Sequence, residues 1–397
     1  MKTLKHILAA TTLLVTLGFA SEANAQVPLE NFFKNPEKAG YQISPDGKYF
    51  SYMAPYENRL NLFVQEVGSD KATRITSETV RDLAGSMWAN GHRILYIKDT
   101  AGDENFQLYG VNVDGTDSKA YTAFPKVRTT IIDPLENIDS LVIIGLNKRN
   151  PQVFDPYRLN LNNGELTQLA ENPGNIQGWM TDHNGKLRVA LAIVDGVNTQ
   201  ILYRETEEQP FRPVLTTNFK ETVSFATFTP DNKMVYALTN IGRDKTALVL
   251  MDPATCEEKE VLYTNDKYDI SGLGYSELKK KLISVSCTGH KGTIRHYFDK
   301  NEEAIRTKLE QKLEGYDINT TSEDKSENIR IIYAGGDRTY GTYYTYNVKE
   351  DKLTKIADLA PWIKEEDMVP MHPITYTSRD GLTIEGYLTL PKGYTME

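Results

Sequence analysis

The chain has few of the residues that build disulfide scaffolds and metal centres. Only two cysteines, Cys256 and Cys287, occur in 397 residues, which excludes a disulfide framework and leaves either one bond or two free thiols. The six histidines are widely spaced, and His290 and His296 lack the i, i+4 spacing of a helical zinc pair. We therefore expect these histidines at surface or turn positions, and we expect no metal and no other cofactor.

Positive charge and long apolar runs are also scarce. Lys and Arg number 45 against 54 Asp and Glu, so the formal net charge is −9, the wrong sign for a nucleic-acid-binding surface. The longest apolar run, residues 7–20, is too short to span a bilayer comfortably. With 40% apolar and 25% charged residues, the composition is that of an ordinary globular protein. No nucleic acid and no membrane anchor are expected as partners.

The first 25 residues have the pattern of a secretory signal peptide. A basic start, MKTLKH, precedes the apolar run ILAATTLLVTLGFA, and Ala23–Ala25 reads Ala-Asn-Ala, the small-x-small form that signal peptidase cuts. We expect cleavage after Ala25 and export of the protein to a periplasm or the medium, with an uncleaved anchor as the alternative. No cysteine lies near the cleavage site, so a lipid anchor is not expected.

What the sequence does contain is an internal repeat. Each copy has a polar turn, an apolar strand, a polar loop, a second strand, a tight turn and a third strand, as in SPDGKYFSYMAP followed by NLFVQEVGSDKATRIT. The steps between the repeated turns are 44, 47, 47, 48, 46 and 47 residues, taken from turns near Asp46, Asn90, Asn137, Asn184, Asn232, Leu278 and Lys325. Each step has room for four short strands, and the Asn-Gly and Asp-Gly pairs favour hairpin turns.

A unit of this length with four antiparallel strands is typical of a β-propeller blade. One blade cannot bury both of its faces alone, and stacking the blades in a closed ring does so. The fold predicted is therefore all-β, a propeller with seven four-stranded blades; a sandwich with long loops would not explain the constant step. Six or eight blades stay open, because the last two copies are degenerate and the segment VPLENFFKNPEKAGYQI lends itself to a closing strand. Glu302–Lys312 fits either a helix turn or an outer strand.

The repeat ends at Leu359. Residues 360–373 contain three prolines and no repeat turn, which favours an extended linker. Residues 374–397 then alternate polar and apolar side chains around Arg379-Asp380-Gly381, which predicts a hairpin of two strands. Two strands alone are marginally stable in water, so this hairpin reads as the beginning of another domain.

The segment SRDGLTIEGYLTLPKG closely resembles the hairpin that opens the α/β-hydrolase domain of serine peptidases of the prolyl oligopeptidase family. The segments ISPDGKYFSYMAP, DTAGDENFQLYGVNVDG and TNIGRDKTAL resemble propeller segments of its dipeptidyl-peptidase and acylaminoacyl-peptidase branches. The predicted organisation is thus a signal peptide over 1–25, a propeller over 26–359 and a linker over 360–373, and the resemblance implies that 374–397 is the incomplete start of a peptidase domain. It also implies a chain truncated before the catalytic domain, with that C-terminal α/β-hydrolase domain as its missing partner.

The catalytic residues that the resemblance implies are not in the sequence. Acyl transfer by this family needs a serine on a G-x-S-x-G elbow, with a His base and an orienting Asp. Ser276, in GLGYSELKK, is the nearest candidate, but Leu278 replaces the second glycine. We expect no catalytic residue in the chain and no peptidase activity of its own.

Substrate contacts are expected instead from polar loops that follow apolar strands. In GDEN, the carboxylate of Asp103 or Glu104, together with Asn105, would bind a peptide's α-ammonium group, and Arg149 or Arg243 would bind a carbonyl or carboxylate. The structural alternative is that these loops form salt links between blades and cap turns. Dipeptidyl peptidases of the family show a paired-glutamate motif, but Glu207-Glu208 lies in an outer hairpin without that context, which favours acylaminoacyl-peptidase or oligopeptidase activity.

The function predicted from the sequence is the substrate-gating propeller of an exported serine peptidase that hydrolyses short peptides through an acyl-enzyme. One alternative is a stand-alone periplasmic propeller that scaffolds partners, which would leave the partly apolar segment 371–397 exposed to water. A second is a propeller hydrolase with a metal in its central channel, such as a lactonase; the first strands carry no convergent set of histidines and carboxylates that would support it.

Overall fold

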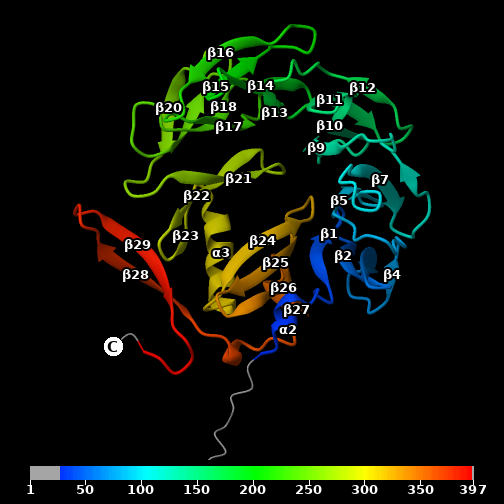
Figure 1. Ribbon diagram of the computed structural model, residues 1–397, viewed down its shortest axis with the longest axis vertical. Helices are drawn as coiled ribbons and strands as arrows, with labels where there is room; N and C mark the ends of the chain where they lie inside the picture. Colours follow the sequence, from blue (N-terminus) through cyan, green and yellow to red (C-terminus); the bar gives the residue numbers. More distant parts are fainter. Residues whose placement is uncertain (1–26, 396–397) are drawn as a thin grey trace, which may run out of the picture.

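The protein is a ring of small antiparallel sheets (Figure 1). We call the space that the ring encloses the channel, and a cavity lined by innermost strands lies in it. The computed structural model describes residues 27–395. Seven sheets follow one another along the chain, and within each sheet the strands are hydrogen-bonded in sequence order. The predicted seven-bladed β-propeller is confirmed. The first strand of each blade lies nearest the channel, and the later strands lie progressively further out.

The strands of the first five blades have the following bounds. Blade one contains β1 (Ala39–Ile43), β2 (Tyr49–Tyr56), β3 (Arg59–Glu66) and β4 (Ala72–Arg74). Blade two contains β5 (Gly85–Asn90), β6 (Arg93–Lys98), β7 (Gln107–Asn112) and β8 (Lys119–Ala120). Blade three contains β9 (Thr129–Asp133), β10 (Leu141–Asn150), β11 (Val153–Asn160) and β12 (Leu166–Gln168). Blade four contains β13 (Ile176–Thr181), β14 (Leu187–Val194), β15 (Asn198–Tyr203) and β16 (Arg212–Thr217). Blade five contains β17 (Val223–Phe228), β18 (Val235–Thr239), β19 (Ala247–Met251) and β20 (Glu258–Tyr263).

Blade six differs from the others because a helix follows its third strand. It contains β21 (Ile270–Ser276), β22 (Lys281–Gly289) and β23 (Gly292–Tyr297), and the chain continues into α3 (Lys300–Lys312). Asp299 caps this helix by accepting hydrogen bonds from the backbone N–H groups of Asn301 and Glu302 at 2.9 and 3.2 Å. The segment Glu302–Lys312 is therefore helical, and four hydrogen-bonded strands are present in six of the seven blades. Blade seven contains β24 (Asp317–Glu323), β25 (Ile329–Gly336), β26 (Thr339–Asn347) and β27 (Lys352–Asp358).

The repeated turns found in the sequence join the first and second strands of the blades. In the first of them, Ser44 accepts hydrogen bonds at Oγ from the N–H groups of Lys48 and Tyr49, and it donates one to Asp46 Oδ1 at 2.7 Å. Gly47 has φ 74°, a left-handed conformation that suits glycine. Thr229 and Asp231 form the same arrangement in blade five, with Oγ1 to Oδ1 also at 2.7 Å. Because the contacts within each turn involve residues only a few positions apart, the same short sequence pattern marks these turns along the chain.

The alternation of strand directions divides the turns between two faces of the disc. We call the face that carries the turns between first and second strands face A. The turns between second and third strands, and the connections from one blade to the next, lie on the opposite face, which we call face B.

The ring closes by side-chain packing between blade one and blade seven. Tyr41 of β1 packs against Tyr343 of β26 with ring centroids 5.4 Å apart, and fully buried Ile331 of β25 belongs to the same apolar cluster. The backbone N–H of Ile43 donates to Ser322 Oγ at 3.1 Å. The N-terminal segment adds no closing strand between residues 27 and 38. It forms the short helix α2 (Leu29–Phe33) instead.

After blade seven the chain forms a linker and the predicted hairpin. The linker includes a short 3-10 helix, η1 (Glu365–Asp367), and the hairpin consists of β28 (Met371–Thr377) paired with β29 (Thr383–Thr389). Figure 1 shows this hairpin outside the ring, beside blade six. The linker begins on face B, where Trp362 donates a hydrogen bond to the carbonyl of Asn31 at 2.9 Å.

Cys256 and Cys287 are both free thiols. Burial raises the pKa of the Cys256 thiol to about 11. The predicted signal peptide, residues 1–25, lies outside the described residues. From residue 27 to residue 395, no helix has the length and apolar character needed to cross a membrane.

Candidate functional site: the central channel

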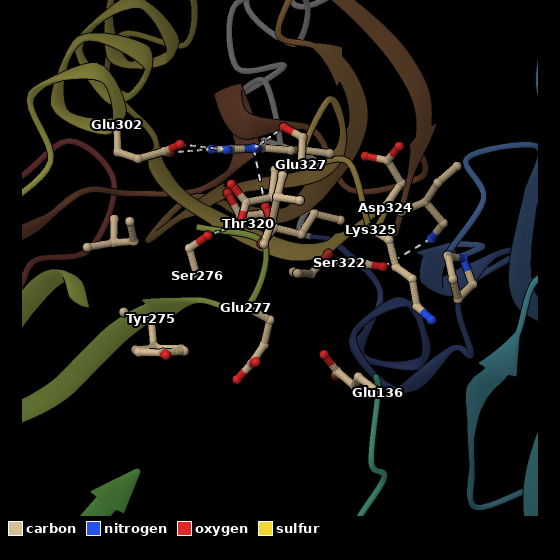
Figure 2. Close-up of a pocket in the computed structure, with 18 of the residues that line it drawn as sticks. Glu136, Tyr275, Ser276, Glu277, Glu302, Thr320, Ser322, Asp324, Lys325 and Glu327 are labelled. Carbon is tan, nitrogen blue, oxygen red and sulfur yellow. Dashed lines mark hydrogen bonds and ion pairs between the residues drawn. The ribbon is translucent and has the colours of Figure 1, made fainter. Parts of the chain in front are cut away.

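A cavity of about 1040 Å³ occupies the channel near face A. Its walls come from the innermost strands of blades one, two, six and seven, from the first turns of blades three and six, and from α3. Figure 2 shows the side chains that point into it, among them Glu136, Tyr275, Glu277, Glu302, Thr320 and Glu327. Its size is that of a small-molecule or short-peptide pocket, since such sites measure roughly 300–1,000 Å³.

The first turn of blade three reaches across the channel. Asn137 donates a hydrogen bond from Nδ2 to Glu277 of blade six at 2.9 Å. Asp139 accepts one from Lys325 of blade seven at 2.7 Å. These contacts join turns 140 and 186 residues apart in the sequence. The first turn of blade three therefore narrows the channel at face A.

Carboxylates dominate this end of the channel. The hydrogen bond with Glu277 raises the pKa of His183, and the same contact holds the pKa of Glu277 below its usual range. The Glu136 side chain is accessible from the channel, but the surrounding protein restricts the solvation of its charge. That restriction, together with the nearby carboxylates of Glu277 and Asp133, raises the pKa of Glu136.

Deeper in the cavity the charges are paired with one another. Arg330 donates two hydrogen bonds to Glu302, at 2.8 and 3.0 Å, and Lys279 donates a third to Glu302 at 2.6 Å. Lys279 also lies 3.1 Å from Glu327. These groups stabilise the junction of α3 with blades six and seven. No set of three or more His, Cys, Asp or Glu side chains among residues 27–395 is arranged to hold a metal ion.

The sequence-predicted residues of blade two lie on face B, in the connection between β6 and β7. Asp103 accepts hydrogen bonds at Oδ1 from the N–H groups of Thr100 and Asn105, both at 3.1 Å, and at Oδ2 from the Asn105 side chain. The hydrogen bonds from Asn105 hold the pKa of Asp103 below its usual range. Glu104 has φ 57° and donates its N–H to Asp99. The three predicted residues form one turn, and the carboxylates of Asp103 and Glu104 are exposed on it.

The two predicted arginines lie on the same face, each with an ion-pair partner in its own blade. Arg149 binds fully buried Asp155 through Nε at 2.9 Å and Nη2 at 3.0 Å. Arg243 binds both carboxylate oxygens of Glu258 through Nη2, at 2.8 and 2.9 Å. Both are structural ion pairs, but they lie within one blade and not between blades, as the structural alternative to substrate binding had it.

Two further sequence motifs also have structural contacts. Glu207 accepts a hydrogen bond from Arg158 at 2.8 Å and another from the backbone N–H of Leu187 at 3.1 Å, within the outer part of the propeller. Ser276 is buried at the end of β21 and donates a hydrogen bond to Glu327.

Sequence reasoning missed the channel residues, above all Glu136, Glu277 and His183. The sequence feature that could have identified these three residues is their position beside the repeated turns. Glu136 and Glu277 directly precede Asn137 and Leu278, two of the repeated turn positions, and His183 directly precedes a third, Asn184. Because all first turns gather on face A, polar residues next to them are candidates for the channel mouth.

The hairpin is held on face B by one cluster in blade six. Glu385 of β29 accepts hydrogen bonds from Lys267 and from the Tyr268 hydroxyl, the latter at 3.2 Å. The ring of His290 contacts the carbonyl of Gly386 at 3.1 Å, and Tyr387 donates its hydroxyl to the carbonyl of His290 at 2.8 Å. We call these residues the hairpin clamp. It brings the hairpin and the linker to the same face of the disc.

Comparison with known proteins bears on the family and the fold of the chain. No profile of a known protein family matches the chain. Dipeptidyl aminopeptidase BIII of Pseudoxanthomonas mexicana is 29% identical over 372 residues, which cover 91% of this chain and 52% of that protein. Dipeptidyl peptidase family member 6 of Caenorhabditis elegans is 26% identical over 403 residues, covering 96% of this chain and 53% of that protein. The chain thus spans about half the length of the curated relatives it matches.

Solved structures agree in fold. A prolyl endopeptidase, one of two analysed for interdomain dynamics, superposes with a TM-score of 0.64 at 12% identity, over 91% of this chain and 55% of that one. Prolyl oligopeptidase B from Galerina marginata superposes with a TM-score of 0.59 at 12% identity, over 92% of this chain and 57% of that one. The chain therefore carries a seven-bladed propeller of the prolyl oligopeptidase type. Its curated relatives are peptidases, and the resemblance to the prolyl oligopeptidase family is confirmed.

Proposed function

We propose that this chain is the propeller portion of an exported serine peptidase that hydrolyses short peptides through an acyl-enzyme. In this proposal residues 1–25 are a signal peptide, 26–359 the propeller, 360–373 a linker, and 374–397 the start of an α/β-hydrolase domain. That domain supplies the catalytic Ser, Asp and His, and the propeller limits which peptides reach them.

The observation that carries the proposal is the position of the hairpin. The linker and the hairpin both lie against face B, and the clamp of Lys267, Tyr268 and His290 holds the hairpin there. A catalytic domain that continues from the hairpin would cover face B. Its active site would then open toward the channel, whose walls exclude folded proteins and shield the reacting groups from bulk water.

Face B also carries the residues proposed to contact substrate. The exposed carboxylates of Asp103 and Glu104 face the space between the disc and such a domain, where they attract a peptide's α-ammonium group. Arg149, Arg243 and Asn105 contribute hydrogen-bond donors on the same face, and the first two keep their internal partners while they do so.

Peptide binding by the purified chain tests the proposal. A fluorescein-labelled tripeptide with a free amino group is titrated against wild type and against an Asp103→Asn, Glu104→Gln variant. We expect the variant to bind at least about threefold more weakly, the scale of an exposed charge pair. Asp114→Asn is the matched control, because Asp114 is an exposed turn carboxylate of the same blade on face A. Equal affinities for all three proteins would contradict the role given to Asp103 and Glu104.

A second measurement tests whether the propeller chain lacks peptidase activity of its own. The chain alone should not release nitroaniline from dipeptidyl or N-acetylated chromogenic substrates, because it contains no G-x-S-x-G sequence. Hydrolysis that co-purifies with the chain and persists after repeated chromatography would overturn the assignment of the chemistry to another domain. N-terminal sequencing of protein from the periplasm should give Gln26 as the first residue.

A further inference from the structure

The cavity extends beyond the channel into a slot between blade six and helix α3. One wall of the slot is formed by Ser284 of β22 and by Arg295 and Tyr297 of β23, and the other by Ile305 and Leu309 of α3. Because β23 is the outermost strand of blade six, a cavity lined by its residues runs outward from the axis toward the rim of the disc. The same cavity includes Trp88 and Thr320 in the channel, so slot and channel form one continuous space.

The slot exists because the apolar side chains of α3 pack on blade seven and not on blade six. Leu309 of the helix lies in one apolar cluster with Ile332 and Tyr346 of blade seven. The buried residues of blade six, such as Val285, instead pack toward blade five, in a cluster with Leu248. Within residues 27–395, no cluster of buried apolar residues joins the strands of blade six to α3.

The side-chain contacts that do cross this junction lie at one end of it. Ser276 donates to Glu327, Lys279 donates to Glu302 at 2.6 Å, and Lys281 lies 2.7 Å from Asp299. The blade-six partners all fall within or beside the first turn, on face A. The junction is therefore fastened at face A by polar contacts, and away from that face the two walls are separated by the cavity.

We propose that this slot is a lateral entrance through which extended peptides reach the channel from the rim of the disc. This inference rests on the proposed function, since it assigns a route to the peptides handled by the propeller. The walls suit a peptide chain. Ile305 and Tyr297, both half-buried, supply apolar surface, Ser284 supplies a hydroxyl, and Arg295 forms no ion pair with any described residue and can donate to a peptide carbonyl. A folded protein cannot pass, because the walls belong to neighbouring blades fastened together at face A.

The first arm of the test asks whether the slot is open, without any peptide. A neutral soluble nitroxide is added to methyl-labelled protein, and the broadening of individual methyl signals is measured by NMR. We expect the δ-methyl of Ile305 to broaden at least about fivefold more than that of Ile144, which is fully buried in blade three. Equal protection of the two methyl groups would show that solutes do not enter the slot and would overturn the inference.

The second arm asks whether peptides use the slot. Ile305→Trp fills it, whereas Ala304→Trp places the same bulk on the exposed side of the same helix. The association rate of the labelled tripeptide should fall at least tenfold in Ile305→Trp and stay within twofold of wild type in Ala304→Trp. Equal rates in both variants would overturn the lateral entrance and leave the proposed function standing. An open slot with no peptide binding to wild type would instead contradict the proposed function and, with it, the use of the slot by peptides.

Discussion

Arg330 and Glu302 form a buried bidentate ion pair that ties helix α3 to blade seven. The guanidinium donates to the two carboxylate oxygens at 2.8 and 3.0 Å, and the side chains are only 9% and 10% exposed. Burial opposes the charge of Glu302, but the hydrogen bonds from Arg330 and Lys279 outweigh it and hold the pKa of Glu302 below its usual range. The helix that replaces an outer strand in blade six is thus fixed to its neighbour by charge as well as by apolar packing.

Loss of this pair should weaken the whole ring. Glu302→Gln keeps the shape of the side chain but leaves Arg330 without its main counter-charge. Breaking a buried pair costs about 3–5 kcal/mol, and the nearby carboxylate of Glu323, 3.3 Å from Arg330, reduces the expected loss to about 2 kcal/mol. Urea unfolding measures it. Glu303→Gln, on the same helix with a 46% exposed side chain, is the control and should change stability by less than about 0.5 kcal/mol. Equal effects of the two changes would contradict the role given to the pair.

The hairpin clamp makes a separate prediction about local motion. Glu385→Gln removes the charge that Lys267 and Tyr268 bind, so the hairpin should leave face B more often. Amide hydrogens of residues 371–389 should then exchange at least about threefold faster, with no change in the core strands of blade three. Lys364→Gln, in the linker and 69% exposed, is the control. A global rise in exchange, or no rise at all, would show that the clamp does not position the hairpin.

The repeat could be predicted from the sequence because each turn is specified by residues close together in the chain. The channel residues could not, because their contacts join residues far apart in the sequence. The turn at Asp46 is specified by Ser44 and Gly47 within four residues, so its recurrence predicts blades and their number. The contact of Asn137 with Glu277 joins turns 140 residues apart and exists only once the ring has closed. No local pattern encodes such a pair.

Helix α3 shows a third case, in which the local signal itself was weak. Of its 13 residues only Glu302 and Leu309 are buried, so the segment has little of the apolar stripe by which a surface helix is recognised. The sequence does contain a helix-start signal, because Asp299 is a favourable N-cap residue and Glu302 and Glu303 occupy the first turn. In the folded protein Leu309 of the helix packs into the apolar cluster of blade seven, a contact that no local pattern shows.

The cap of α3 predicts a pH-dependent contribution to stability. The hydrogen bond from Lys281 is the main reason that the pKa of Asp299 falls to about 2 in the folded protein, from 3.8. A lowered pKa means that the ionised cap stabilises the fold above about pH 4 and that this contribution disappears as the pH falls from 3.8 toward 2. Asp299→Ala should therefore cost about 1 kcal/mol at pH 7, the usual value of an N-cap.

The difference between Asp299→Ala and wild type should shrink as the pH is lowered below 4. Urea midpoints measured at pH 7, 5 and the lowest pH at which both proteins still fold provide the comparison. Asp244→Ala, with an 89% exposed side chain in a face B turn, is the control and should be neutral throughout. A cost for Asp299→Ala that stays constant with pH would mean that packing, not the charged cap, is what the substitution removes.

The closure of the ring without a strand shared between its end blades predicts where the disc opens first. Ile331 is fully buried in the cluster that joins blade seven to Tyr41 and Ile43 of β1, and no strand from one blade is hydrogen-bonded into the sheet of the other in the described chain. Ile331→Ala should cost about 2–5 kcal/mol, as other buried large-to-small changes do. Ile144→Ala removes the same atoms from the core between blades two and three, so its global cost should be similar.

Hydrogen exchange distinguishes the two variants. Ile331→Ala should selectively expose the amides of β1 and β24 through local separation of the two end blades. Ile144→Ala should speed exchange only through global unfolding. Identical exchange patterns in the two variants would mean that the contact between blades one and seven is no weaker than any other junction of the ring.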